Sequence, residues 1–117
     1  MMLDEELGIH YILDLCLCNP ILLNNSTQVL ELLKKAVIEA NATLVDEIKY
    51  EFTPQGFTAV CLLAESHISI HTWPEKEYAA LDIFTCGETT YPDKACEFLI
   101  RELESKKQNT TVLKRGI

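Results

Sequence analysis

Apolar residues recur along this chain at two spacings, one typical of helices and one typical of strands. Between residues 24 and 41 they recur every three or four positions, which predicts an amphipathic helix. Asn25 or Ser26 provides its N-cap, and Lys34 and Lys35 lie on its polar side. The apolar positions of this helix are Val29, Leu32, Leu33, Ala36, Val37 and Ala40.

Shorter apolar or alternating segments predict six strands and a second helix. The expected strands cover residues 8–17, 42–52, 57–64, 67–73, 78–86 and 110–116. A turn with the sequence TPQG, residues 53–56, joins two of them into a hairpin. The second helix is expected near residues 93–106, because Ala95, Leu99 and Leu103 share one helical face.

The order of these elements indicates the fold class. One strand and one helix precede four strands, and a helix and a final edge strand close the chain. This order predicts an α+β two-layer sandwich, in which a mostly antiparallel sheet carries two helices on one face. The other face of the sheet must also be covered, and a second copy of the chain would cover it most economically.

Composition limits the classes of function. A chain of 117 residues that is 48% hydrophobic suits one domain, residues 1–117, with a single core. A formal charge of -8 repels nucleic acid and anionic lipid but attracts a cationic small molecule. No apolar run is long enough for a membrane span, and the acidic start MMLDEELG is unlike a secretory signal. We therefore expect a cytoplasmic protein whose cysteines are reduced, since the five cysteines lack a disulfide or CxxC pattern.

The segment AESHISIHTWPE, residues 64–75, gathers the candidate chemistry of the chain. His67 and His71 could share a metal ion on a helix, but on a strand their rings lie roughly 13 Å apart, far beyond the ~4 Å between two zinc ligands. No metal site is therefore expected. Ser66 or Cys86 could serve as the nucleophile of a hydrolase, although neither has the local signature of one. The segment could also be a polar strand without chemistry.

Four motifs together carry a resemblance to a known family. They are ESHISIHTWPE (65–75), YAALDIFTCG (78–87), GIHYILDL (8–15) and FTPQGFTAV (52–60). Over nearly the whole chain, these motifs and the spacing from Ser66 to His71 to Cys86 closely resemble the prokaryotic-type S-adenosylmethionine decarboxylase proenzymes.

This resemblance implies an enzyme that makes its own cofactor. Ser66 would attack the carbonyl of Glu65 and convert the peptide bond to an ester, and elimination would then cut the chain. Residues 1–65 would become a β chain, and residues 66–117 an α chain that begins with a pyruvoyl group made from Ser66. That group would bind the substrate amine as a Schiff base. His71 matches the processing base and Cys86 the proton donor of the decarboxylation.

The resemblance also implies a substrate and its contacts. Phe52 and Trp73 match the aromatic positions near the adenine of S-adenosylmethionine, and Glu75 matches the carboxylate that binds the ribose. Thr58 stands where the family commonly has a serine that supports processing, so a hydroxyl is kept but a methyl group is added. The expected product is the aminopropyl donor for spermidine and other polyamines, and the expected assembly is a homodimer.

Two alternatives stay open. The same fold could decarboxylate ornithine or arginine with a pyruvoyl group, although Phe52, Trp73 and Glu75 have no adenosine to bind in that case. The chain could instead be an unprocessed regulatory partner of an active relative. Intact Ser66, His71 and Cys86 argue against this second alternative.

Overall fold

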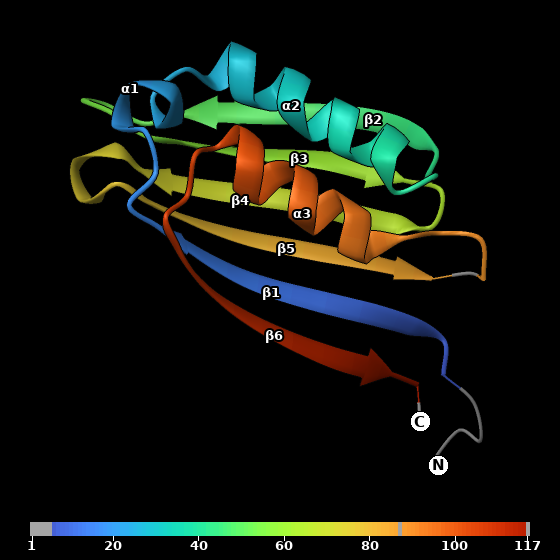
Figure 1. The fold of residues 1–117 in the computed structure, drawn as a ribbon. Coiled ribbons are helices and arrows are strands. Elements are labelled where there is room, and N and C mark those ends of the chain that lie inside the picture. The colour runs from blue at the N-terminus through green and yellow to red at the C-terminus, as the bar shows by residue number, and fades with distance from the viewer. Residues whose placement is uncertain (1–5, 87, 117) are drawn as a thin grey trace.

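A computed structural model describes residues 6–86 and 88–116, so Gly87 of the YAALDIFTCG motif and the acidic residues 4–5 lie outside the described part. Six strands form one sheet in the order β2-β3-β4-β5-β1-β6, and every neighbouring pair is antiparallel. Helices cover one face of this sheet (Figure 1). The strands are β1 (Gly8–Cys16), β2 (Leu44–Glu51), β3 (Phe57–Leu63), β4 (Ser66–Trp73), β5 (Tyr78–Cys86) and β6 (Lys107–Arg115). The helices are α1 (Pro20–Leu23), α2 (Ser26–Glu39) and α3 (Pro92–Glu102), with a 3-10 turn, η1 (Pro74–Lys76).

This arrangement confirms the predicted α+β sandwich, and α2 shows why its sequence forms the central helix. The side chain of Asn25 caps the helix by accepting a hydrogen bond from the backbone N–H of Gln28 at 3.0 Å. Val29, Leu33 and Ala36 are fully buried against the sheet. The predicted apolar side of the helix is therefore its packing side. None of the described helices combines the length and apolarity needed to cross a membrane.

Two predicted boundaries were wrong by three or four residues, and one short helix was not predicted. The helix α3 ends at Glu102 rather than near residue 106, because Leu103 caps it and Glu104 takes a φ of +58°. The edge strand begins at Lys107 rather than at residue 110, since Lys107 already pairs with Cys16. The short helix α1 was not predicted. Four residues are too few to show a helical period, and its signal was the Asn19 side chain, which accepts hydrogen bonds from the first backbone N–H groups.

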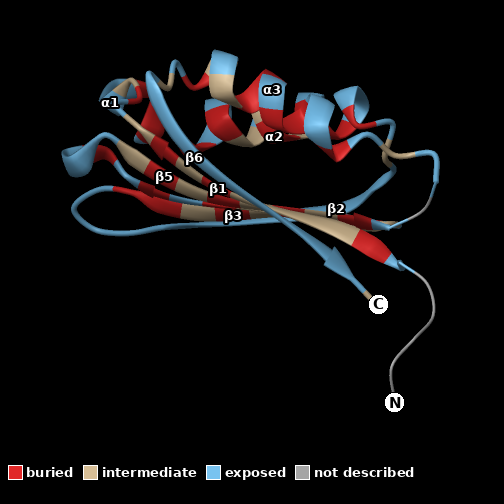
Figure 2. Ribbon diagram, turned by 60° about the horizontal axis from the view of Figure 1, so that its bottom comes forward, coloured by how far each residue is buried: buried red, intermediate tan, exposed pale blue. Residues whose placement is uncertain are grey.

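The two faces of the sheet differ sharply in burial. Strand β4 alternates as predicted: Ile68 and Ile70 are fully buried beneath the helices, whereas His67, Ser69 and His71 point to the opposite face. No described helix covers that opposite face, which we call the open face (Figure 2). Residues that share it include His10, Val60, Ser69, His71, Trp73, Tyr78, Asp82 and Phe84. The open face is half-buried or exposed along its whole length.

Candidate active site

The bond expected to be cut lies in the tight hairpin between β3 and β4. Leu63 pairs with Ser66, so Ala64 and Glu65 form a two-residue loop. Such loops usually place a loop residue at positive φ. The described non-glycine residues with positive φ are Leu17, Asn41, Ser66, Glu77 and Glu104. Ser66 has a φ of +153°, which L residues rarely adopt, so the strain of this hairpin falls beside the Glu65–Ser66 peptide bond.

The carbonyl oxygen of Glu65 accepts two hydrogen bonds from one residue. The backbone N–H of Cys86 donates at 3.0 Å, and its thiol Sγ donates at 2.8 Å. The pairing of Ser66 with Thr85 brings the end of β5 beside the loop and so places Cys86 there. Two donors on one carbonyl oxygen are the arrangement that stabilises the negative charge of a tetrahedral intermediate. We call this end of the sheet, with Glu65, Ser66 and Cys86, the cleavage end.

The imidazole closest to the Ser66 hydroxyl in the described contacts is that of His67, not that of His71. Ser66 Oγ lies 3.4 Å from His67 Nδ1. His71 lies five residues further along β4, which places it about 16 Å away. His71 Nδ1 instead forms a hydrogen bond with Thr58 Oγ1 at 2.8 Å. A single chain therefore does not bring its own His71 to its own Ser66.

The residues expected to bind substrate gather at the far end of the sheet, together with His71. Trp73 is 39% exposed, and its ring lies 6.5 Å from that of His71 and 5.4 Å from that of Tyr78. Phe52 is 52% exposed at the end of the β2–β3 hairpin. Glu75 is exposed in the first turn of η1. We call this the aromatic end, comprising Phe52, Thr58, His71, Trp73 and Glu75.

Polar pairs occupy the middle of the open face. His10 Nε2 and Asp82 Oδ1 lie 2.9 Å apart, while the His10 Nδ1 atom is buried without a hydrogen-bond partner in the described structure. The hydroxyl of Tyr78 donates to Asp14, and this hydrogen bond, followed by burial, raises the pKa of Tyr78 to about 12. The guanidinium of Arg115 lies over the ring of Phe84 at 5.5 Å. The open face therefore carries ordered, partly desolvated polar groups.

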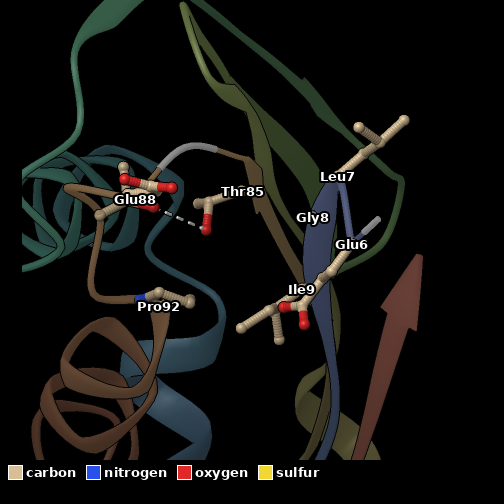
Figure 3. A pocket seen from close by; sticks show the side chains of 8 residues that line it. Glu6, Leu7, Gly8, Ile9, Thr85, Glu88 and Pro92 are labelled. Atoms are coloured by element: carbon tan, nitrogen blue, oxygen red, sulfur yellow. Dashed lines mark hydrogen bonds between the residues drawn. The ribbon is translucent and has the colours of Figure 1, made fainter. Parts of the chain in front are cut away.

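A cavity of about 550 Å³ adjoins the cleavage end on the helical side of the sheet (Figure 3). The start of β1, the end of β5 and the segment before α3 line it. Glu6 and Glu88 contribute carboxylates, and the hydroxyl of Thr90 donates to that of Thr85 at 3.2 Å. Thr85 is the strand partner of Ser66, so this cavity lies next to the bond expected to be cut.

The cysteines divide into one accessible thiol at the cleavage end and others held in less accessible places. All five are free. Burial raises the pKa of Cys18 and Cys61 to about 11 and that of Cys96 to about 12, whereas Cys86 is exposed. Cys18, Cys61 and Cys96 are therefore thiols of the buried core. Within residues 6–86 and 88–116, no three His, Cys, Asp or Glu side chains cluster closely enough to hold a metal ion.

Residues 9–116 match the family model described as S-adenosylmethionine decarboxylase. The chain belongs to the S-adenosylmethionine decarboxylase family. It is 50% identical over 109 residues to the S-adenosylmethionine decarboxylase proenzyme of Prochlorococcus marinus (strain MIT 9211), covering 93% of this chain and 89% of that one. It is 38% identical over 113 residues to the proenzyme of Thermococcus gammatolerans, covering 97% and 79%.

A solved structure shows the same fold. The crystal structure of the adenosylmethionine decarboxylase from Aquifex aeolicus VF5 superimposes with a TM-score of 0.91 at 39% identity. The match covers 97% of this chain and 94% of that chain. These relatives confirm the family suggested by the four sequence motifs, and the family consists of enzymes.

Sequence reasoning missed two residues that contact the segment expected to be cut. His67 follows Ser66 directly, so its proximity could have been read from the sequence. Thr43 contacts Glu65, which lies 22 residues further along the sequence, and no sequence motif predicts that contact. Ser66, Glu65 and Cys86 fit the chemistry of a self-cleaving serine, because a strained backbone, a nucleophilic hydroxyl and a doubly hydrogen-bonded carbonyl coincide.

Proposed function

We propose that this protein cuts itself between Glu65 and Ser66 and then decarboxylates S-adenosylmethionine, yielding the aminopropyl donor for polyamines such as spermidine. The observation that carries the proposal is the Glu65 carbonyl, which accepts both the N–H and the thiol of Cys86 beside the strained Ser66. The relatives reported above all bear the S-adenosylmethionine decarboxylase name, so the ornithine and arginine alternatives gain no support from them. The five free thiols suit the reducing cytoplasm that we propose as its location.

In the first step, Ser66 Oγ attacks the carbonyl carbon of Glu65. A carbon–oxygen bond forms, the carbon–nitrogen bond breaks, and the proton of the hydroxyl ends on the released Ser66 amine. The two donors of Cys86 stabilise the negative charge on the carbonyl oxygen meanwhile. His67, at 3.4 Å, is the base that the chain itself offers for the Ser66 hydroxyl. Strain at Ser66 is released as the amide becomes an ester.

In the second step, a base removes the proton from the Ser66 α-carbon, and the bond from the β-carbon to the ester oxygen breaks. Glu65 leaves as a carboxylate and ends the β chain, residues 1–65. The α chain, residues 66–117, begins with dehydroalanine, whose nitrogen is replaced by water with loss of ammonia to give the pyruvoyl group. No oxidant is needed, because elimination and hydrolysis account for every atom.

We propose that His71 is the base of this second step and that it comes from a second copy of the chain. A single chain holds His71 about 16 Å from Ser66, so the site is incomplete without a partner. Two open faces packed about a two-fold axis would lay the aromatic end of one copy over the cleavage end of the other. Exposed apolar side chains of the sheet, among them Ile48 and Leu62, would be buried in the process. Thr58 would orient His71 through their 2.8 Å hydrogen bond.

The residues of the aromatic end suit the binding of S-adenosylmethionine. Phe52 and Trp73 present exposed ring faces on which adenine could stack, at about 1 to 3 kcal/mol for each ring. The same faces and the charge of -8 favour a sulfonium cation. Glu75 can accept hydrogen bonds from the ribose hydroxyls. The pyruvoyl group would supply a ketone that condenses with the substrate amine and takes up the electrons released with carbon dioxide.

Cys86 would then return a proton to the substrate α-carbon. Thiols ordinarily hold their proton at neutral pH and release it far more readily than hydroxyls do. The thiol already lies at the cleavage end. Once Glu65 has been released, the thiol no longer donates to the Glu65 carbonyl and can donate to the substrate instead. One side chain thus serves both the self-cleavage and the decarboxylation.

Intact mass measurement of the purified protein tests the first half of this proposal. We expect two chains, ending at Glu65 and beginning at a modified Ser66, and an α chain that Edman chemistry cannot sequence. A single uncut chain would favour the regulatory alternative. Release of labelled carbon dioxide from S-adenosylmethionine, ornithine and arginine, measured side by side, tests the second half.

A further inference from the structure

Thr43, which precedes β2, forms three hydrogen bonds to the cleavage hairpin. Its backbone N–H donates to Glu65 Oε1 at 2.9 Å, and its hydroxyl donates to Glu65 Oε2 at 3.2 Å. Its carbonyl accepts the N–H of Ala64 at 2.9 Å. The mechanism proposed above uses none of these contacts.

Glu65 is therefore fixed at both ends. Thr43 holds its carboxylate with two donors, and Cys86 holds its carbonyl with two more. Only the Cα atom and two methylene groups of Glu65 lie between the two anchored groups, and the next residue is the strained Ser66. Since both anchors come from outside the hairpin, rotation of the Glu65 backbone cannot release the strain without breaking hydrogen bonds.

We propose that Thr43 is a positioning residue for self-cleavage that acts through the Glu65 side chain. This inference rests on the proposed function, because it assumes that the Glu65–Ser66 bond is the bond that breaks. Thr43 would hold the carbonyl carbon at the angle that Ser66 Oγ requires. Small displacements of reacting groups slow reactions strongly, so such an anchor affects rate more than stability.

A second physical effect points the same way. Negative charge develops on the Glu65 carbonyl oxygen as Ser66 attacks, and the Glu65 carboxylate is the negative group on the same residue. Two donors from Thr43 hold this carboxylate against the turn before β2 and offset its charge. A released carboxylate could swing toward the developing charge and repel it.

The test compares precursor cleavage in matched variants. Thr43→Val removes the hydroxyl but keeps size and backbone, Thr43→Ser restores the hydroxyl, and Thr110→Val makes the same change on the exposed strand β6. We expect Thr43→Val to slow cleavage about tenfold, roughly the effect of one hydrogen bond to a charged group. Thr43→Ser and Thr110→Val should cleave within about twofold of the wild type. Cleavage is followed by intact mass after rapid purification.

A double-mutant cycle distinguishes positioning from a general loss of structure. In a Glu65→Ala background, which has no carboxylate to hold, Thr43→Val should slow cleavage no further. Melting temperatures measured in a Ser66→Ala background, where no chain is cut, should be alike with and without Thr43→Val. Cleavage of Thr43→Val at the wild-type rate, or an equal loss of cleavage rate in the wild-type and Glu65→Ala backgrounds, would overturn the role of Thr43 and leave the proposed function standing. Failure of the wild type itself to cleave would remove the proposed function together with this inference.

Discussion

Removing the thiol of Cys86 separates its two proposed roles. In Cys86→Ala the Glu65 carbonyl keeps the backbone N–H at 3.0 Å and loses the Sγ donor at 2.8 Å. Loss of one donor from an oxyanion site ordinarily slows the reaction by about 100- to 1,000-fold. A thiol is a weak donor and the N–H remains, so we expect the smaller value, about 100-fold or about 2.7 kcal/mol. The variant should therefore accumulate as an uncut precursor that matures slowly.

Cys86→Ser provides the comparison. Its hydroxyl can still donate to the Glu65 carbonyl, so self-cleavage should return to within about tenfold of the wild-type rate. A hydroxyl gives up its proton much less readily than a thiol, so carbon dioxide release and correct protonation of the product should still be impaired. Cys16→Ala serves as the control, because Cys16 is a half-buried thiol at the other end of β1.

The assay is a time course of intact mass from freshly translated precursor, followed by single-turnover decarboxylation of the matured fraction. Two results would refute the reasoning. Self-cleavage of Cys86→Ala at the wild-type rate would show that the thiol does not stabilise the developing charge. Decarboxylation by matured Cys86→Ser at the wild-type rate would show that the thiol is not the proton donor.

Three further changes test the dimer, a titrating pair and the core. Ser66→Ala and His71→Ala chains should each stay uncut when refolded alone. When the two are refolded together, the His71→Ala chain should be cut, because its Ser66→Ala partner supplies His71. Intact mass identifies the cut chain, and the absence of any cut chain would contradict a shared site. Folding raises the pKa of Tyr78 from 10.0 to about 12, so its hydrogen bond to Asp14 stabilises the fold below pH 10 and this contribution is lost as the pH rises toward 12. Unfolding in denaturant between pH 9 and 12 should show a shallower loss of stability for Tyr78→Phe than for the wild type, and equal slopes would disprove the coupling. Leu33→Ala, at a fully buried position of α2, should lower the free energy of unfolding by about 3 kcal/mol, whereas Ile38→Ala, at a 76% exposed position of the same helix, should change it by less than about 0.5 kcal/mol in the same denaturant titration.

Periodicity in the sequence predicted the elements that bury a regular apolar side. The alternation of β4 and the spacing of Val29, Leu33 and Ala36 in α2 each follow from burial beneath or against the sheet. Periodicity failed where a partner strand decides the structure. Lys107 and its polar neighbours have no strand pattern, yet they pair with β1 as far as Cys16.

The site could be predicted in part, and only through the family resemblance. The four motifs brought Ser66, Cys86 and Glu65 into the hypothesis, and the structure places these three residues together. Strand geometry alone indicates that His71 lies far from Ser66 in one chain. The contact between Thr43 and Glu65 depends on how the turn before β2 meets the β3–β4 hairpin, which no local pattern in the sequence encodes.

The strand order has a consequence for the mature enzyme. Cutting between β3 and β4 would assign β1, β2 and β3 to one polypeptide and β4, β5 and β6 to the other, yet β1 lies between β5 and β6. The two products would thus share one sheet, and they could not separate without breaking the hydrogen bonds between neighbouring strands. Refolding after denaturation would become a reaction between separate molecules, dependent on concentration, and would lack the loop that aligned them the first time. Maturation would therefore be a one-way event for the architecture as well as for the covalent chain.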